Sequence, residues 1–147
     1  MQLIVKNFDE LTTRELYEIY KVRFDVFVVE QQCCYQDADE FDPMSIHMWL
    51  QDEEGIVAYL RVLPPNTVFD VPSLGRVLSV KRRMGFGTQI VKEGIKVAKE
   101  RFGADIIKIE AQTYVRKMYE DIGFVQSSEE FLDVGIPHIN MQLIIGE

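Results

Sequence analysis

The sequence predicts one α+β domain spanning residues 1–147, with a mixed, mostly antiparallel sheet and helices on both of its faces. Short strand-like runs of apolar residues are the first observation, and two longer amphipathic segments with helical spacing are the second. The third is their order, in which strands and helices are interspersed without a repeat, linker or low-complexity stretch. A chain of 147 residues with 47% hydrophobic residues is long enough to bury one sizeable core.

The amino-terminal segments are expected to form a strand, a helix and an acidic loop. QLIVKNF at residues 2–8 has alternating apolar residues and reads as a strand. Thr12 and Glu15 have the spacing of a capping box, so a helix should begin there. Apolar residues then recur on one helical face, at Leu16, Ile19, Tyr20, Phe24, Phe27 and Val28. Residues 30–45 carry acids and a proline, and we expect a loop or an irregular second helix that is too acidic for the core.

The central segments predict three strands. IHMWLQ (46–51) and IVAYLRVL (56–63) flank a short polar stretch, which indicates a hairpin with Gly55 at its tight turn. A proline-rich loop then leads to LGRVLSV (74–80), which reads as a further short strand.

The remaining segments predict two helices and three strands. An amphipathic helix should run from Gly87 to near Gly103, with apolar residues on one face and lysines on the other. ADIIKIEA (104–111) has the composition of a buried strand, and VRKMYEDIG (115–123) that of a short helix closed by its glycine. Two final strands, FVQSSEEFLDV and HINMQLII, are joined through the turn GIP.

Charge and composition exclude several classes of partner. The formal net charge is −8, from 24 acidic and 16 basic residues, which argues against binding to nucleic acid or to an anionic membrane. No apolar stretch approaches the length of about 20 residues that spans a bilayer, and the amino terminus does not resemble a signal peptide. The adjacent Cys33 and Cys34 are poorly placed for a stabilising disulfide, so we expect a reduced, cytoplasmic protein.

The stretch KRRMGFGTQI at residues 81–90 joins a strand to a helix through two glycines. The first N–H groups of that helix have no intrahelical partner, and the positive end of its dipole favours an anion such as a phosphate. A turn with a solvated basic cluster is the alternative interpretation. A Walker A sequence is absent, and Ile90 occupies the place of the third glycine in the dinucleotide-binding fingerprint.

Two motifs carry a resemblance to a known family. Arg82-x-x-Gly85-x-Gly87 resembles the pyrophosphate loop of the GCN5-related N-acetyltransferases, and Tyr119-x-x-x-Gly123-Phe124 is similar to their tyrosine helix and glycine-phenylalanine turn. FVVEQQCCYQDADEFD, LGRV and GIPHINMQL resemble the ElaA-like branch, so the resemblance spans nearly the whole chain. The sequence departs from the family pattern at two places. The stretch LSVKRRM before the glycines is shorter, so either Arg82 or Arg83 could anchor the pyrophosphate. Gln112 occupies a position where many members have asparagine.

The resemblance implies the acyl-CoA N-acyltransferase fold and a cleft for acetyl-CoA between the fourth and fifth strands. The residues it assigns to the cosubstrate are Val77, Leu78, Ser79, Arg82, Arg83, Gly85, Gly87, Thr88, Gln112 and Tyr119. Backbone N–H groups of the fourth strand would stabilise the oxyanion in a direct transfer to the amine of a small molecule or peptide.

Direct transfer needs an acid and a base rather than a nucleophilic side chain. The resemblance gives Tyr119 the role of the acid that protonates the departing thiolate. Glu30 and His138 are the first candidates for the base, with Asp37, Asp39 and Glu110 as further ones. The acidic loop would attract a cationic amine or would only be solvated. We expect no metal, because no zinc-type or calcium-type spacing occurs.

Two other functions also agree with the sequence. A non-catalytic module that binds acyl-CoA would carry the same loop, and a nicotinamide oxidoreductase would use the glycines in another way. HINMQLII could also pair with its copy at a sheet edge and form a homodimer.

Overall fold

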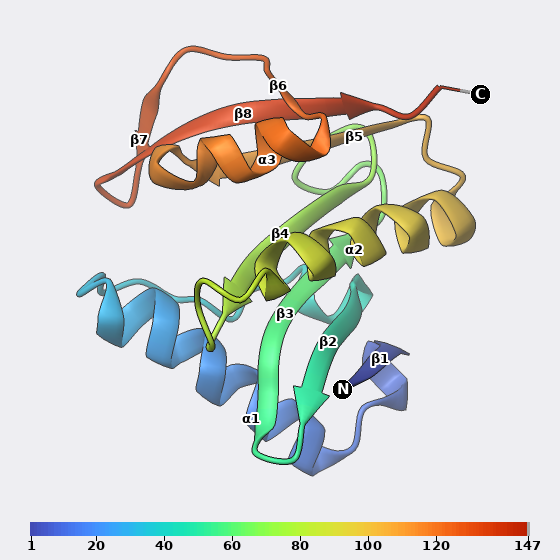
Figure 1. Ribbon diagram of the computed structural model, residues 1–147, viewed down its shortest axis with the longest axis vertical. Helices are drawn as coiled ribbons and strands as arrows, with labels where there is room; N and C mark the ends of the chain where they lie inside the picture. The colour runs from blue at the N-terminus through green and yellow to red at the C-terminus, as the bar shows by residue number, and fades with distance from the viewer. Residues whose placement is uncertain (147) are drawn as a thin grey trace.

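The structure is a computed structural model that describes residues 1–146. Its centre is an eight-stranded sheet with the order β1-β2-β3-β4-β5-β8-β6, and β7 also pairs with β8 (Figure 1). The strands are β1 (Gln2–Asn7), β2 (Ile46–Asp52), β3 (Gly55–Leu63), β4 (Ser73–Ser79), β5 (Ile106–Gln112), β6 (Val125–Gln126), β7 (Phe131–Asp133) and β8 (Ile136–Ile144). Within residues 1–146 only β4 and β5 pair in parallel, which confirms the mixed, mostly antiparallel sheet.

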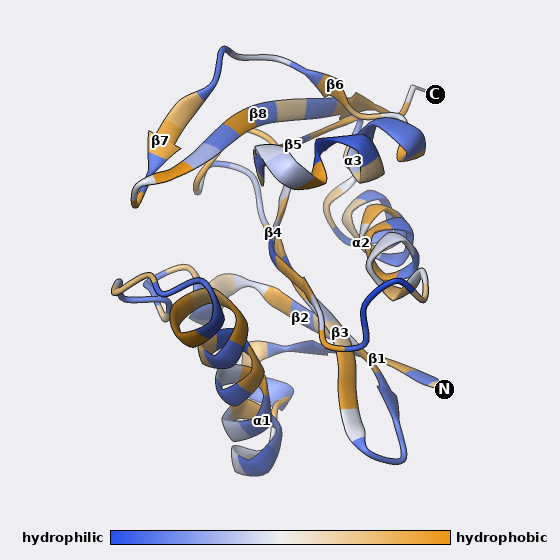
Figure 2. Ribbon diagram, turned by 60° about the vertical axis from the view of Figure 1, so that its left-hand side comes forward, coloured by the Kyte–Doolittle hydropathy of each residue, from blue (hydrophilic) through white to orange (hydrophobic). Residues whose placement is uncertain are grey.

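Helices cover both faces of the sheet, as predicted. They are α1 (Thr13–Arg23), α2 (Phe86–Phe102) and α3 (Arg116–Ile122). Four shorter helical segments accompany them, namely η1 (Phe8–Glu10), η2 (Phe24–Glu30), η3 (Asp42–Met44) and η4 (Thr113–Val115). The sheet separates α1 from α2 in Figure 2, and α3 lies on the side of α2. No helix of residues 1–146 has the length and hydropathy needed to cross a membrane.

The first helix begins as predicted but ends early. The Thr12 side chain accepts the Glu15 N–H at 3.0 Å, and the Glu15 carboxylate accepts the Thr12 N–H at 2.9 Å. The α-helix stops at Arg23 and continues as the π-helical segment η2. The wider turn leaves Phe24 41% exposed, whereas Phe27 packs on the cluster beneath α1, so a single helical period does not describe both segments.

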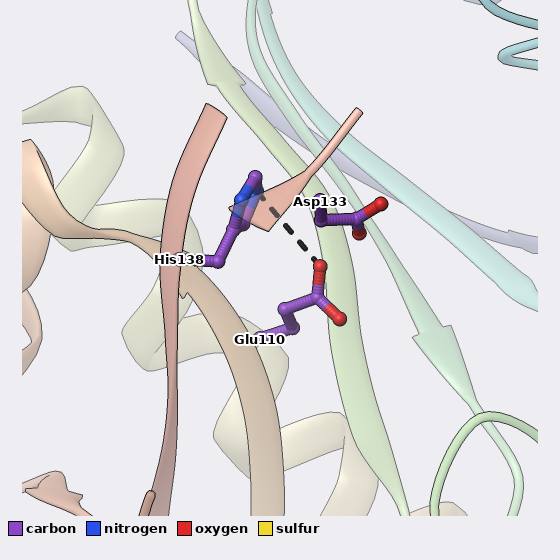
Figure 3. A group of neighbouring side chains, drawn as sticks. All are labelled: Glu110, Asp133 and His138. Atoms are coloured by element: carbon purple, nitrogen blue, oxygen red, sulfur yellow. Dashed lines mark ion pairs between the residues drawn. The ribbon is translucent and has the colours of Figure 1, made fainter. Parts of the chain in front are cut away.

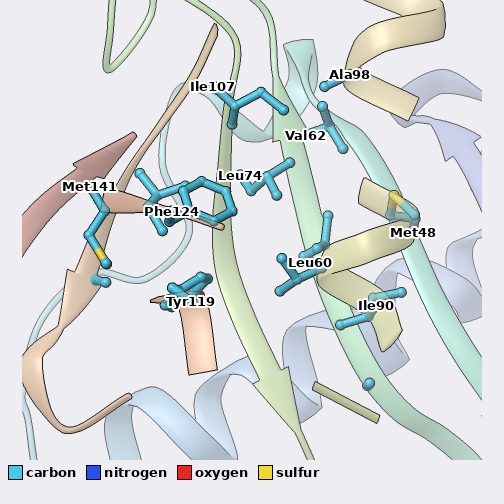
Figure 4. Close-up of a cluster of buried hydrophobic side chains, with 14 of the residues drawn as sticks. Met48, Leu60, Val62, Leu74, Ile90, Ala98, Ile107, Tyr119, Phe124 and Met141 are labelled. Atoms are coloured by element: carbon cyan, nitrogen blue, oxygen red, sulfur yellow. The ribbon is translucent and has the colours of Figure 1, made fainter. Parts of the chain in front are cut away.

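The larger core lies between the sheet and the pair α2 and α3. Its members include Met48, Leu60, Val62, Leu74, Ile90, Ala98, Ile107, Tyr119, Phe124 and Met141 (Figure 4). Close contact of α2 with the sheet depends on Gly94, because a Cβ there would lie 2.9 Å from Leu60 Cδ2. This packing fixes the start of α2, and therefore the glycine-rich loop, against β4.

The acidic segment 30–45 departs from the prediction that it is too acidic for the core. Asp37 and Asp42 are only 2% and 1% exposed. The Arg23 Nε atom lies 2.8 Å from Asp37 Oδ2, and Arg61 Nη1 lies 2.8 Å from Asp42 Oδ1. The carboxylates are buried because arginines from α1 and β3 neutralise them, which the local composition of the loop does not reveal.

The carboxyl-terminal strands also differ from the prediction. The run FVQSSEEFLDV divides into β6 and β7, and both pair with β8. Residues between them stay attached to β8, since Ser127 N donates to Asn140 O at 2.8 Å and Asn140 N donates to Ser128 Oγ at 2.9 Å. HINMQLII therefore lies between β5 and β6–β7, and the expectation that it forms an exposed sheet edge is wrong.

Candidate active site

The sheet opens between β4 and β5. These strands share a single registered pair, Ser73 and Lys108, whereas β5 and β8 are paired along seven residues. Beyond that pair the strands separate toward their carboxyl ends, and a cleft of about 660 Å³ occupies the space. Its lining comes from β4, β5, η2, the glycine-rich loop, α3 and the β7–β8 turn. A cleft of this size matches a small-molecule site.

A bulge in β4 shapes one wall of the cleft. Gly75 pairs with Arg61 and Leu78 with Tyr59, so β4 has two residues opposite one residue of β3. Arg76 lies in this bulge with a φ of 51°, which is uncommon for a residue other than glycine. Bulges redirect the strand backbone and are frequent beside active sites. The predicted strand residues Val77, within the bulge, and Leu78 and Ser79, just beyond it, all line the cleft.

The glycine-rich loop forms one end of the cleft. Gly85 has a φ of 78° and precedes α2, so the chain turns sharply before the first helical N–H groups. A Cβ on Gly87 would lie 3.4 Å from Met118 Sδ, which keeps this part of the loop narrow. The helix start, with its unpaired N–H groups, can hold an anionic phosphate. Thr88 and Arg83 also line this end.

Arg82 is already engaged in the structure. Its guanidinium forms an ion pair with Glu30 and donates from Nε to the Ser79 carbonyl at 3.2 Å. Both side chains of the pair are about half exposed, at 53% for Arg82 and 49% for Glu30. Arg83 forms no ion pair within residues 1–146.

Tyr119 lies on α3 at the other wall. It is 5% exposed and packs edge-to-face on Phe124, with ring centroids 5.6 Å apart. Burial raises the pKa of its phenol, so the group stays protonated and able to donate at neutral pH. Gly123 ends the helix with a φ of 126° and lets the chain return to place Phe124 beside the ring.

Two amide side chains connect the segments on either side of the cleft. Gln31 Nε2 lies 3.2 Å from Gln112 Oε1, and Gln112 Nε2 lies 3.2 Å from Gln31 Oε1. Gln31 follows η2, and Gln112 ends β5. The chain beyond α1 therefore contacts both the glycine-rich loop, through Glu30, and the fifth strand.

A second polar group lines the cleft where β5 leaves β4. Figure 3 shows Glu110, Asp133 and His138 as neighbours from β5, β7 and β8, with His138 and Glu110 joined as an ion pair. Burial, followed by the nearby Asp133 carboxylate, raises the pKa of Glu110 to about 8, while Arg76 opposes this shift. The carboxyl group thus exchanges its proton near neutral pH, as a general base should.

The residues predicted from sequence are not all gathered here. Among residues 1–146, the cleft lining includes Val77, Leu78, Ser79, Arg82, Arg83, Gly85, Gly87, Thr88, Gln112, Tyr119 and His138. Glu30 does not contribute to that lining and contacts Arg82 instead, and Asp37 is buried with Arg23. Sequence reasoning gave no role to Arg76, although it belongs to the quoted segment LGRV, or to Asp133, because only strand register brings both to the cleft.

Comparisons with known proteins agree with this geometry. The family described as "Acetyltransferase (GNAT) domain" matches residues 16–145. Protein ElaA of Escherichia coli is 32% identical over 138 residues, covering 90% of this chain and 89% of that protein. The crystal structure of Escherichia coli ElaA superimposes with a TM-score of 0.89 at 27% identity, covering 97% of this chain and 98% of that one.

An acyl-CoA N-acyltransferase from Pseudomonas aeruginosa has an equally similar structure. Its TM-score is 0.90 at 32% identity, and the match covers 97% of this chain and 99% of that one. The fold, the family match and the similar relatives agree. The chain therefore belongs to the GNAT acetyltransferase family, in its ElaA-like branch.

Proposed function

We propose that residues 1–147 form a single N-acetyltransferase domain that moves an acetyl group from acetyl-CoA directly to the amine of a small molecule or peptide. The observation that carries the proposal is the cleft between β4 and β5, which has the start of α2 at one end and ionisable groups on its lining. Family membership supports an acyl-CoA cosubstrate.

The cosubstrate would be held through its phosphates and its acyl arm. The N–H groups at the start of α2 would receive the diphosphate, with Arg83 and Arg82 supplying charge. Backbone N–H groups of β4 beyond the bulge at Arg76 would face the thioester carbonyl and stabilise negative charge on its oxygen.

The proton transfers are assigned to two side chains. Tyr119 would donate its proton to the departing sulfur, since burial keeps the phenol protonated. Among the candidate bases, Glu110 is favoured over Glu30, because it lines the cleft and its pKa is raised to about 8. His138 lies beside it and is the second candidate.

Release of free CoA thiol tests the proposal. Purified protein is incubated with acetyl-CoA and a panel of primary amines, and Tyr119→Phe is the matched variant. Thiol release that depends on the amine, and falls at least about 10²-fold in kcat in the variant, supports an enzyme. Binding of CoA without turnover on any amine would instead identify a non-catalytic acyl-CoA-binding module.

Location and assembly are part of the proposal as well. Cys33 and Cys34 are both unpaired, as expected in a reducing cytoplasm. Since β8 is covered on both sides, a homodimer built by strand pairing would have to use β1 or the outer strands β6 and β7.

A further inference from the structure

Glu110, Asp133 and His138 form a three-membered cluster, here named the acceptor cluster, on the cleft wall. One oxygen of each carboxylate and one ring nitrogen of His138 lie within 4.8 Å of one another. Glu110 is two residues beyond Lys108, the last residue of β5 that is registered with β4. The acceptor cluster therefore lies where the two strands begin to separate, at the proposed place of acetyl transfer.

Within residues 1–146, the acceptor cluster contains an ion pair of His138 Nε2 with Glu110 Oε2 at 3.9 Å, which carries charge only when His138 is protonated, and no lysine or arginine forms an ion pair with Glu110 or Asp133. The charge of Arg76 acts on Glu110, but its guanidinium is bound by Asp37 at 2.8 Å and by Asp39 at 3.3 Å. Two carboxyl groups so close together are stabilised by any cation that enters between them.

His138 supplies an independent indication of a ligand. The residue is 8% exposed, and its Nδ1 lies 2.6 Å from the Ile136 carbonyl oxygen. A carbonyl only accepts, so Nδ1 carries a proton, and in the neutral form of the ring Nε2 carries a lone pair. Nε2 is 3.9 Å from Glu110 Oε2 and has no hydrogen-bond partner within residues 1–146. This largely buried side chain thus directs an acceptor atom of its neutral form toward the carboxylates at the cleft wall, where no donor of residues 1–146 meets it.

An ammonium group fits these three acceptors. It has three N–H donors, and acceptors about 2.9 Å away in tetrahedral directions lie about 4.7 Å from one another. The 4.8 Å spread of the acceptor cluster accommodates such a group.

We infer that Glu110, Asp133 and His138 bind the amino group of the acceptor, and that the acceptor is a cationic primary amine without a nearby carboxylate. The inference rests on the proposed acetyl transfer and adds the chemical class of its second substrate. A carboxylate on the acceptor would be repelled by Asp133 and Glu110.

The proton balance assigns a step to each group. The Glu110 carboxylate takes one proton from the ammonium, which breaks an N–H bond and leaves a lone pair on nitrogen. That lone pair forms the C–N bond to the thioester carbonyl carbon, and the C–S bond breaks with its electrons on sulfur. Tyr119 protonates the sulfur, and the second amine proton returns to the phenolate. Glu110 releases its proton to solvent, so one proton leaves per amide formed.

Three amines of equal chain length test the inference. They are n-butylamine, γ-aminobutyramide and γ-aminobutyrate, and the last two differ only in an amide against a carboxylate. With acetyl-CoA, we expect kcat/KM for the amide to exceed that for the carboxylate at least tenfold. Asp133→Asn should raise the KM for n-butylamine about tenfold and leave CoA affinity unchanged. Glu129→Gln is the control, because it removes the same charge from the neighbouring loop outside the cleft lining.

A binding measurement decides the inference even without turnover. The His138 ring signals are followed by NMR while n-butylamine is added to CoA-loaded protein, and we expect them to shift in wild type but not in Asp133→Asn. Equal use of amide and carboxylate, or unmoved His138 signals, overturns the inference. Shifts caused by zinc chloride and not by n-butylamine would also overturn it, since they identify a metal site. Absence of CoA binding and of thiol release would defeat the proposed function instead.

Discussion

The Glu30 carboxylate accepts a hydrogen bond from the Arg82 guanidinium, which joins the end of η2 to the glycine-rich loop. In sequence the two residues are 52 positions apart. The Glu30 carboxylate thus contacts Arg82, the arginine that the family motif would assign to a phosphate of the cosubstrate. Under the proposed function, Glu30 would therefore compete with the cosubstrate for Arg82.

Glu30→Gln should tighten the binding of CoA. The pair is half exposed and contributes roughly 0–1 kcal/mol, so the dissociation constant should fall up to about fivefold. Isothermal titration with CoA measures the change. Glu54→Gln is the matched control, since Glu54 is an exposed carboxylate paired with Lys81 of the same loop. Weaker binding of CoA by Glu30→Gln, with the control unchanged, would contradict the competition.

Arg83→Ala and Arg82→Ala should each weaken CoA binding about tenfold, at the lower end expected for charge-assisted contacts. Pantetheine lacks phosphate groups, so its affinity should not change in either variant. If both variants bind CoA as wild type does, the diphosphate does not occupy the start of α2. Titration of each variant with both ligands makes the comparison.

The raised pKa of Glu110 predicts an unusual dependence of the unfolding free energy on pH. Burial and Asp133 raise its folded-state pKa from the ordinary 4.5 to about 8, against the opposing charge of Arg76, with His138 also beside it. Because the folded pKa is the higher one, the group's contribution is fully present below about pH 4.5 and is lost as the pH rises through about 8.

Glu110→Gln removes this titration. We expect equal unfolding free energies for variant and wild type near pH 4, and a variant more stable by about 1–3 kcal/mol near pH 9. Urea unfolding at both pH values measures the difference. A difference that is the same at both values would show that Glu110 titrates normally.

The lowered pKa of Asp42 predicts the opposite dependence of the unfolding free energy on pH. Burial opposes its ionisation, but hydrogen bonds and charge from Arg23, with Arg61, outweigh burial and lower the pKa from 3.8 to about 2. Its stabilising contribution is present above about pH 4 and is lost as the pH falls through about 2. Asp42→Asn leaves buried arginines without that charge and should cost about 3–5 kcal/mol in unfolding free energy at neutral pH.

Asp70→Asn is the control for Asp42→Asn, because Asp70 forms an exposed pair with Lys108. We expect a change below about 1 kcal/mol there. Comparable losses in both variants would show that burial of Asp42 is unimportant.

The amino-acid sequence by itself determined the order of the main helices and strands as far as α3, the capping box at Thr12 and the glycine-rich loop before α2. These features depend on residues close together in the chain, whose spacing fixes local backbone geometry. The apolar strands and the two amphipathic helices likewise predicted the mixed sheet with helices on both faces.

Only the tertiary structure decided which charged side chains meet. The pairing of β8 with β5 and β7 brings Glu110, Asp133 and His138 together, and the burial of Asp37 depends on Arg23 from another element. Charge interactions act through space, and their partners are set by strand register and helix packing. The segment 30–45 looks solvent-exposed from its composition, but contacts with distant arginines bury part of it. In the same way, Glu30 forms an ion pair with Arg82.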